Sequence, residues 1–217
     1  MKRMVMMLMI SLALVSCKKE KINGSGEVIT ETRTVNEFYN VSVSGSTDVF
    51  ITKGNNFEVK VKAYENIIPH LETKVQNGTL LIGFKANSNV GNDNSEVYIT
   101  MPNLNSVAVS GSSNVKSTGT FSGSGNFKAT ISGSGNIDLQ AGAATNYKIS
   151  ISGSGSVRSF GFICEQAEVD IAGSGNAELT VTKNLNATID GSGTVYYRGN
   201  PADVYTKITG SGGVVKQ

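Results

Sequence analysis

A short motif, Gly-Ser-Gly, recurs along the second half of the 217-residue chain at nearly constant spacing. Its first glycine stands at positions 133, 153, 173, 191 and 210, so consecutive copies lie 20, 20, 18 and 19 residues apart. Periods of this length are typical of repeat architectures, in which each unit buries its apolar face only against its neighbours. The motif therefore predicts a stack of similar units.

Apolar and polar residues alternate on both sides of each motif, as in Tyr147–Ile151 before it and Ile137–Leu139 after it. Such alternation is typical of a half-buried strand, because successive side chains point to opposite faces. Two glycines around a serine favour a tight corner, since positive φ costs glycine little. Each unit should therefore contain a strand, a Gly-Ser-Gly corner, a second strand and a looser corner. The expected corner glycines are Gly133, Gly135, Gly153, Gly155, Gly173, Gly175, Gly191, Gly193, Gly210 and Gly212.

Two columns are apolar throughout when the units are aligned on the first glycine. Two residues before it stand Ile131, Ile151, Ile171, Ile189 and Ile208; four residues after it stand Ile137, Val157, Ala177, Val195 and Val214. If the units stack as parallel strands about 4.8 Å apart, both columns form ladders of core side chains. Removing one ladder isoleucine should then cost about 2–5 kcal/mol.

The chain that follows residue 26 is expected to divide into two portions, with the boundary after residue 106. Residues 27–106 form an N-terminal β portion, and residues 107–217 form the Gly-Ser-Gly repeat portion. Asn77-Gly78 between two apolar runs predicts a β-hairpin. One short helix is expected over Glu65–Thr73, which contains Pro69.

Residues 1–16 combine a basic start, an apolar run and a small residue, the pattern of a secretory signal peptide. Leu14-Val15-Ser16-Cys17 resembles the bacterial lipobox, which implies cleavage before Cys17 and lipidation of this cysteine. An ordinary signal peptide followed by a chance cysteine is the alternative. Residues 17–26 are expected to form a lipidated tether. Lys18 replaces the aspartate that retains lipoproteins in the inner membrane, which favours the outer membrane and leaves open the periplasmic or the cell-surface face.

Charge and cysteine content narrow the range of partners. Without Lys2 and Arg3, 17 basic residues balance 17 acidic ones, and a neutral chain argues against nucleic acid. With Cys17 lipidated, only Cys164 remains, so no intrachain disulfide can form. Cys164 follows Phe160-Gly-Phe-Ile, which favours a buried thiol over a nucleophile.

Three parts of the sequence resemble a known family: Val35–Ser46, Tyr98–Leu104 and the Gly-Ser-Gly repeats. They are similar to DUF2807, the putative auto-transporter adhesin, head GIN domain, found in Bacteroidetes lipoproteins. The resemblance implies a right-handed parallel β-helix of pectin-lyase-like shape, with Gly-Ser-Gly at the turn between two sheets. It also implies an adhesive role and hints at a homo-trimer. It supplies no catalytic residues.

The sequence offers little catalytic chemistry, and no cofactor or metal is expected. His70 is the only histidine, so a Ser-His pair or a His-rich metal site cannot form around the repeats. Glu168, Asp170 and Asp190 form the best acidic cluster, which could bind calcium or act as an acid/base pair on a glycan. Pairing of these carboxylates with Lys148, Lys183 and Lys207 is the favoured interpretation.

Two tyrosines, Tyr196 and Tyr205, are expected near the same face. They could stack on sugars, although tyrosines on a β-surface are commonly just good strand formers. The leading hypothesis is a non-catalytic, lipid-anchored adhesion module that presents a flat polar face to a glycan or a protein. The alternatives are a polysaccharide-acting enzyme and a periplasmic envelope scaffold.

Overall fold

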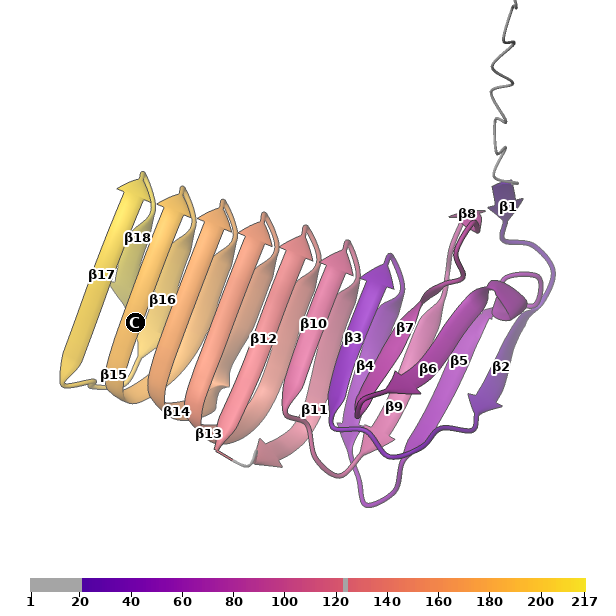
Figure 1. The fold of residues 1–217 in the computed structure, drawn as a ribbon, viewed down its shortest axis with the longest axis horizontal. Coiled ribbons are helices and arrows are strands. Elements are labelled where there is room, and N and C mark those ends of the chain that lie inside the picture. The colour runs from indigo at the N-terminus through magenta and orange to yellow at the C-terminus, as the bar shows by residue number, and fades with distance from the viewer. Residues whose placement is uncertain (1–20, 123–124) are drawn as a thin grey trace, which may run out of the picture.

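The computed structural model describes residues 21–122 and 125–217, which form a parallel β-solenoid (Figure 1). The expected signal peptide and Cys17 lie outside the described residues. No helix in the described ranges is long and apolar enough to cross a membrane. The elements are β1 Lys21–Asn23, β2 Val28–Arg33, β3 Asn40–Gly45, β4 Asp48–Lys53, β5 Glu58–Tyr64, the 3-10 turn η1 Ile68–His70, β6 Leu71–Gln76, β7 Thr79–Phe84, β8 Asn89–Gly91, β9 Glu96–Met101, β10 Ser106–Gly111, β11 Asn114–Ser122, β12 Asn126–Gly133, β13 Asn136–Gly153, β14 Ser156–Gly173, β15 Asn176–Gly191, β16 Thr194–Arg198, β17 Asp203–Gly210 and β18 Gly213–Lys216.

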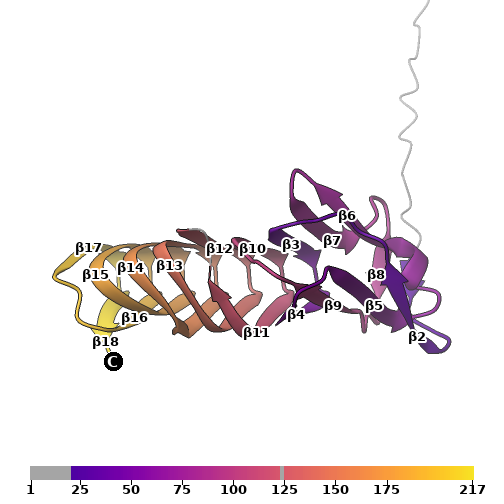
Figure 2. The same cartoon turned by 90° about the horizontal axis from the view of Figure 1, so that it is seen from below.

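Each rung of the solenoid consists of one strand, a glycine corner and a returning strand. The two strands of a rung lie in different layers, so the stack has two sheets (Figure 2). The upper sheet places β3, β10, β12, β17 and the second halves of β13, β14 and β15 side by side, all parallel. The lower sheet does the same with β4, β11, the first halves of β13 to β15, β16 and β18. The predicted parallel stack is confirmed.

The stack begins earlier in the sequence than the repeated motif does. Gly45 is in register with Gly111, and Gly111 with Gly133, so β3 and β4 form a full rung. At this rung Gly45-Ser46 is followed by Thr47, so the second glycine of the motif is missing. The expected tether also enters the fold, because β1 pairs in parallel with β8.

The two glycines of each corner have different roles. The first has φ between +116° and +132° at Gly133, Gly153, Gly173, Gly191 and Gly210, a region that disfavours other residues. In these five corners the second glycine has no positive φ, so the expectation that positive φ requires both glycines is wrong there. A Cβ on Gly155 would lie 2.0 Å from the carbonyl oxygen of Gly135 one rung away. The second glycine is therefore required by close packing between rungs.

Both predicted ladders lie between the two sheets. Ile131, Ile151, Ile171 and Ile189 are at most 2% exposed, and the opposing column from Ile137 to Val195 is fully buried. The last member of the first ladder differs, because Ile208 is 41% exposed. It lies on the terminal rung, where no further described rung covers it.

The N-terminal end of the stack is antiparallel, with β2 paired to β5 and β6 paired to β7. The predicted hairpin is confirmed, since Asn77 and Gly78 have φ of +50° and +69° between β6 and β7. The helix expected over Glu65–Thr73 is wrong, because only the 3-10 turn η1 forms and β6 begins at Leu71. Proline at the start of η1 lacks a backbone donor, and Ile67 and Ile68 pack into the core there.

Candidate functional site

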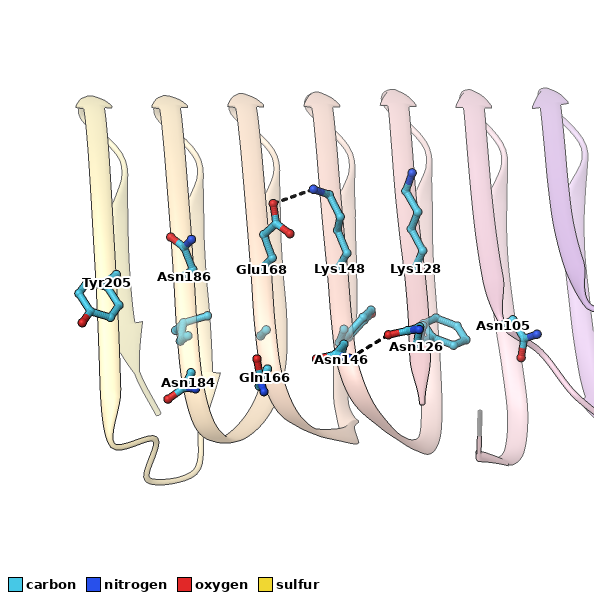
Figure 3. A pocket seen from close by; sticks show the side chains of 14 residues that line it. Asn105, Asn126, Lys128, Asn146, Lys148, Gln166, Glu168, Asn184, Asn186 and Tyr205 are labelled. Atoms are coloured by element: carbon cyan, nitrogen blue, oxygen red, sulfur yellow. Dashed lines mark hydrogen bonds and ion pairs between the residues drawn. The ribbon is translucent and has the colours of Figure 1, made fainter. Parts of the chain in front are cut away.

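A groove of 710 Å³ crosses the outer face of the upper sheet, over β12, β13, β14, β15 and β17. Two rows of side chains line it, each running across the strands (Figure 3). Neighbouring parallel strands lie about 4.8 Å apart, so each row repeats a functional group at that spacing. The lining residues are Asn105, Asn126, Phe127, Lys128, Asn146, Tyr147, Lys148, Gln166, Ala167, Glu168, Asn184, Leu185, Asn186 and Tyr205.

The first row consists of carboxamides at the start of each upper strand, namely Asn126, Asn146, Gln166 and Asn184, with Asn105 at one end. The amide nitrogen of Asn146 donates to Oδ1 of Asn126 at 2.8 Å. The amide nitrogen of Asn184 donates to Oδ2 of Asp203 at 3.2 Å. Figure 3 draws no hydrogen bond from Gln166 to any other side chain that lines the groove. Its donor and acceptor are therefore free for a ligand.

The second row consists of Lys128, Lys148, Glu168, Asn186 and Tyr205 (Figure 3). Lys148 Nζ donates to Glu168 at 2.7 Å and lies 3.4 Å from Asp170, and the hydrogen bond to Glu168 raises the pKa of Lys148. Among residues 21–122 and 125–217, the ion pairs do not include Lys128, and Tyr205 is 67% exposed. The row thus offers one unpaired ammonium, one ion pair and one accessible aromatic ring.

A buried aromatic cluster supports the groove from inside the stack. The ring centroids of Phe127 and Phe162 are 4.6 Å apart, and Tyr147 lies 5.1 Å from Phe162. The Tyr147 hydroxyl donates a hydrogen bond to Oγ of Ser159 at 3.2 Å, and desolvation raises the pKa of this phenol. Close-packed aromatic rings hold the backbone under the two rows in place, so the rows are presented on a rigid surface.

The structure brings together only some of the predicted site residues. Glu168 and Tyr205 line the groove, whereas Asp170 and Asp190 line an adjacent hollow of 310 Å³ towards the glycine corners. Tyr196 lies on β16 in the lower sheet, so the expectation that it shares this face is wrong. It follows a corner, and the chain has changed sheets by then.

The lysines expected to neutralise the acidic cluster behave differently from one another. Lys148 contacts both Glu168 and Asp170, as predicted. Lys183 pairs with Glu165 at 2.7 Å, away from the cluster. Lys207 forms no ion pair with any described residue. In the described ranges, no group of three acidic, histidine or cysteine side chains is arranged to hold a metal ion.

The carboxamide row was not recognised from the sequence, although a signal for it exists. Seven residues before each first glycine stand Asn126, Asn146, Gln166, Asn184 and Asp203. Four of these five residues carry carboxamides, and such an aligned polar column indicates a shared surface. The cysteine prediction is confirmed, since Cys164 is a buried free thiol and burial raises its pKa to about 12.

Comparison with known proteins identifies the family. The model of DUF2807, described as "Putative auto-transporter adhesin, head GIN domain", matches residues 37–201. The chain belongs to the DUF2807 family. The comparison with curated proteins gives no match.

Solved structures share the fold of this DUF2807 chain. A putative adhesin from Bacteroides fragilis NCTC 9343 has a TM-score of 0.71 at 19% identity, over 90% of this chain and 100% of that one. A putative lipid binding protein from Parabacteroides distasonis ATCC 8503 has a TM-score of 0.59 at 22% identity, over 91% of this chain and 100% of that one. A putative adhesin from Parabacteroides merdae ATCC 43184 has a TM-score of 0.51 at 24% identity, over 91% of this chain and 99% of that one. One fold thus carries two descriptions, so function must be argued from the site.

Proposed function

We propose that this DUF2807 chain is a non-catalytic adhesion module of the cell envelope, anchored by lipid at Cys17, which binds a glycan in the groove of the upper sheet. The family description and the adhesin descriptions of related folds support an adhesive role at the cell envelope. The observation that supports a glycan as the ligand is the double row of polar side chains, which repeats from rung to rung. A polymer of similar sugar units presents hydroxyl groups in an equally repetitive way.

The chemistry of the rows suits a carbohydrate. Carboxamides pair one donor and one acceptor in a plane, which matches the donor and acceptor character of sugar hydroxyls. Tyr205 offers an exposed ring with a polar tip for contact with the apolar face of a sugar. Lys128 adds an unpaired positive charge, so a glycan with carboxylate groups should bind better than a neutral one.

Catalysis on a glycan is less well supported by the same groove. Its acidic side chain, Glu168, is exposed and accepts a hydrogen bond from Lys148 at 2.7 Å, so this carboxylate is already engaged in an ion pair. A glycosidase-type mechanism needs a second carboxyl group that acts as acid or base. Asp170, the nearest candidate, also faces Lys148.

The binding experiment uses the full chain and immobilised polysaccharides. We expect a polymer of uronic acids to bind, and its carboxyl-reduced form to bind more weakly. Tyr205→Ala should weaken binding about tenfold, equivalent to about 1.4 kcal/mol. The control is Tyr196→Ala, which removes a tyrosine from the opposite sheet. Equal loss in both variants, or no binding to any polysaccharide, contradicts the groove assignment.

The location is tested separately, by protease treatment of intact cells followed by detection of the chain with an antibody. Digestion without lysis places the module on the cell surface, where adhesion requires it. Survival until the outer membrane is breached contradicts adhesion and favours the periplasmic scaffold. A Cys17→Ser variant that is released from the membrane fraction supports lipid anchoring, whereas a variant that remains there contradicts it.

A further inference from the structure

The C-terminal end of the stack is an open edge. Among the described strands, β17 pairs only with β15, and β18 pairs only with β16 (Figure 1). All eight residues of β17 are exposed. Alternate backbone N–H and C=O groups of an edge strand point away from the sheet and can accept a further strand. The end therefore has unused hydrogen-bonding capacity along two strands.

The same end exposes apolar side chains that are buried on every preceding rung. Val204 and Ile208 are 40% and 41% exposed, whereas their partners in register, Leu185 and Ile189, are 0% and 1% exposed. At the opposite end, Ile67 and Ile68 at η1 are only 0% and 4% exposed, whereas Val28 and Ile29 of the edge strand β2 are 46% and 39% exposed. Covering Val204 and Ile208 would remove their apolar surface from water, which is favourable.

The charges on β17 match a second copy of the same strand. Asp203, Tyr205 and Lys207 alternate along one face of β17, with Tyr205 midway between the opposite charges. In an antiparallel pairing centred on Tyr205, each Asp203 lies directly opposite Lys207 of the other copy. A shift that centres the pairing on Lys207 would place two ammonium groups against each other. Opposite charges stabilise such cross-strand pairs, and like charges destabilise them.

We infer that two copies of this chain associate through their C-terminal edges, with β17 antiparallel to β17 and Tyr205 of each copy at the two-fold axis. A two-fold rotation pairs identical surfaces and closes the assembly, so no free C-terminal edge remains. It also places the two β18 edges side by side and extends both sheets across the axis.

The association lengthens the groove described above. Tyr205 lines the last rung of the groove, so the two-fold axis brings the grooves of both copies together at their tyrosines. One long glycan could then contact both copies, which raises the effective affinity without new kinds of contact. The dimer itself does not depend on the glycan, so either proposal can fail alone.

Charge reversal tests the register. Asp203→Lys and Lys207→Asp each create two like-charge pairs across the axis and should weaken the dimer about tenfold or more. The double variant Asp203→Lys/Lys207→Asp restores both pairs and should restore the dimer. A mixture of the two single variants should form a heterodimer. These side chains are exposed, and circular dichroism with a melting temperature confirms that each variant folds.

A crosslinking experiment on the full, detergent-solubilised chain provides the second measurement. Tyr205→Cys should form a disulfide-linked dimer on mild oxidation, and the two charge reversals should each abolish this product. Tyr196→Cys, on the lower sheet, should give no such product. A monomer throughout, a trimer, or filaments from head-to-tail pairing would each overturn the proposal. Equal crosslinking with and without charge reversal would also overturn it.

Discussion

Gly155 lies so close to Gly135 of the preceding rung that a Cβ atom on Gly155 would lie 2.0 Å from the Gly135 carbonyl oxygen. The corner also supplies backbone hydrogen bonds between rungs, since Gly133 O accepts from the N–H groups of Ser154 and Gly155 at 3.0 and 3.2 Å. The same pair of bonds recurs at the following corners. The motif is therefore a device for stacking, and its repetition reflects the repetition of this contact.

Replacement of Gly155 by alanine should destabilise the fold. The added methyl group meets backbone, which can give way only if the rungs separate, and overpacking of this kind costs about 1–3 kcal/mol. Chemical denaturation measures the effect. Gly213→Ala is the matched control, because a Cβ there has no atom within 4 Å and its φ is not positive. Equal stability of the two variants would contradict the packing role of the second glycine.

Truncation of ladder isoleucines should depend on the rung. Ile151→Ala should cost about 2–5 kcal/mol, because Ile151 is 2% exposed between neighbouring rungs. Ile208→Ala should cost clearly less, because Ile208 is 41% exposed on the last rung. Both are measured by denaturation at a concentration where the chain is monomeric. A similar loss for both would show that the terminal rung is as well packed as the middle of the stack.

Alkaline pH should destabilise the protein through Cys164. Its pKa is raised from the usual 9.0 to about 12 by burial, so the folded state retains the thiol proton that the unfolded state loses. This contribution is fully present below pH 9 and is lost as pH rises towards 12, with a slope of up to about 1.4 kcal/mol per pH unit. Burial also raises the pKa of Tyr147, so this phenol adds to the loss of stability at alkaline pH.

The measurement is the free energy of unfolding at several pH values between 8 and 11, on the order of one pH unit apart so that the slope is resolved. Cys164→Ala removes the thiol, so the free energy of unfolding should fall less steeply with pH. The substitution also shifts the free energy of unfolding at neutral pH, but this shift does not depend on pH. A slope unchanged by this substitution would argue against a buried neutral thiol. Thiol labelling should likewise be slow in the native state and fast in denaturant.

The ion pairs of Lys148 should contribute little to stability. Lys148, Glu168 and Asp170 are each 42–52% exposed, and exposed pairs are worth at most about 1 kcal/mol. Lys148→Met should therefore leave the melting temperature almost unchanged, whereas Ile149→Ala, next to it and fully buried, should lower it. A large loss in Lys148→Met would give this surface pair a structural role that its exposure does not suggest.

Much of the fold could be predicted from the sequence because its determinants repeat at a fixed period. Alternation of apolar residues identified the strands, and the isoleucine column identified one wall of the core, since both depend on local spacing. The helix expected over Glu65–Thr73 failed because the neighbouring rungs require Ile67, Ile68 and Leu71 in the core. The packing of those residues overrides the local tendency.

The sequence by itself determined the architecture of this protein: strands, corners, register and the two apolar ladders. Only the tertiary structure decided which polar columns share a face, that Tyr205 joins the groove and Tyr196 does not, and that Val204 and Ile208 on the last rung stay exposed while their partners in register are buried. The physical reason is the distance along the sequence between the residues that interact. A ladder follows from residues a few positions apart, whereas a groove and an open end follow from which rungs lie beside one another and which side of a corner each residue occupies.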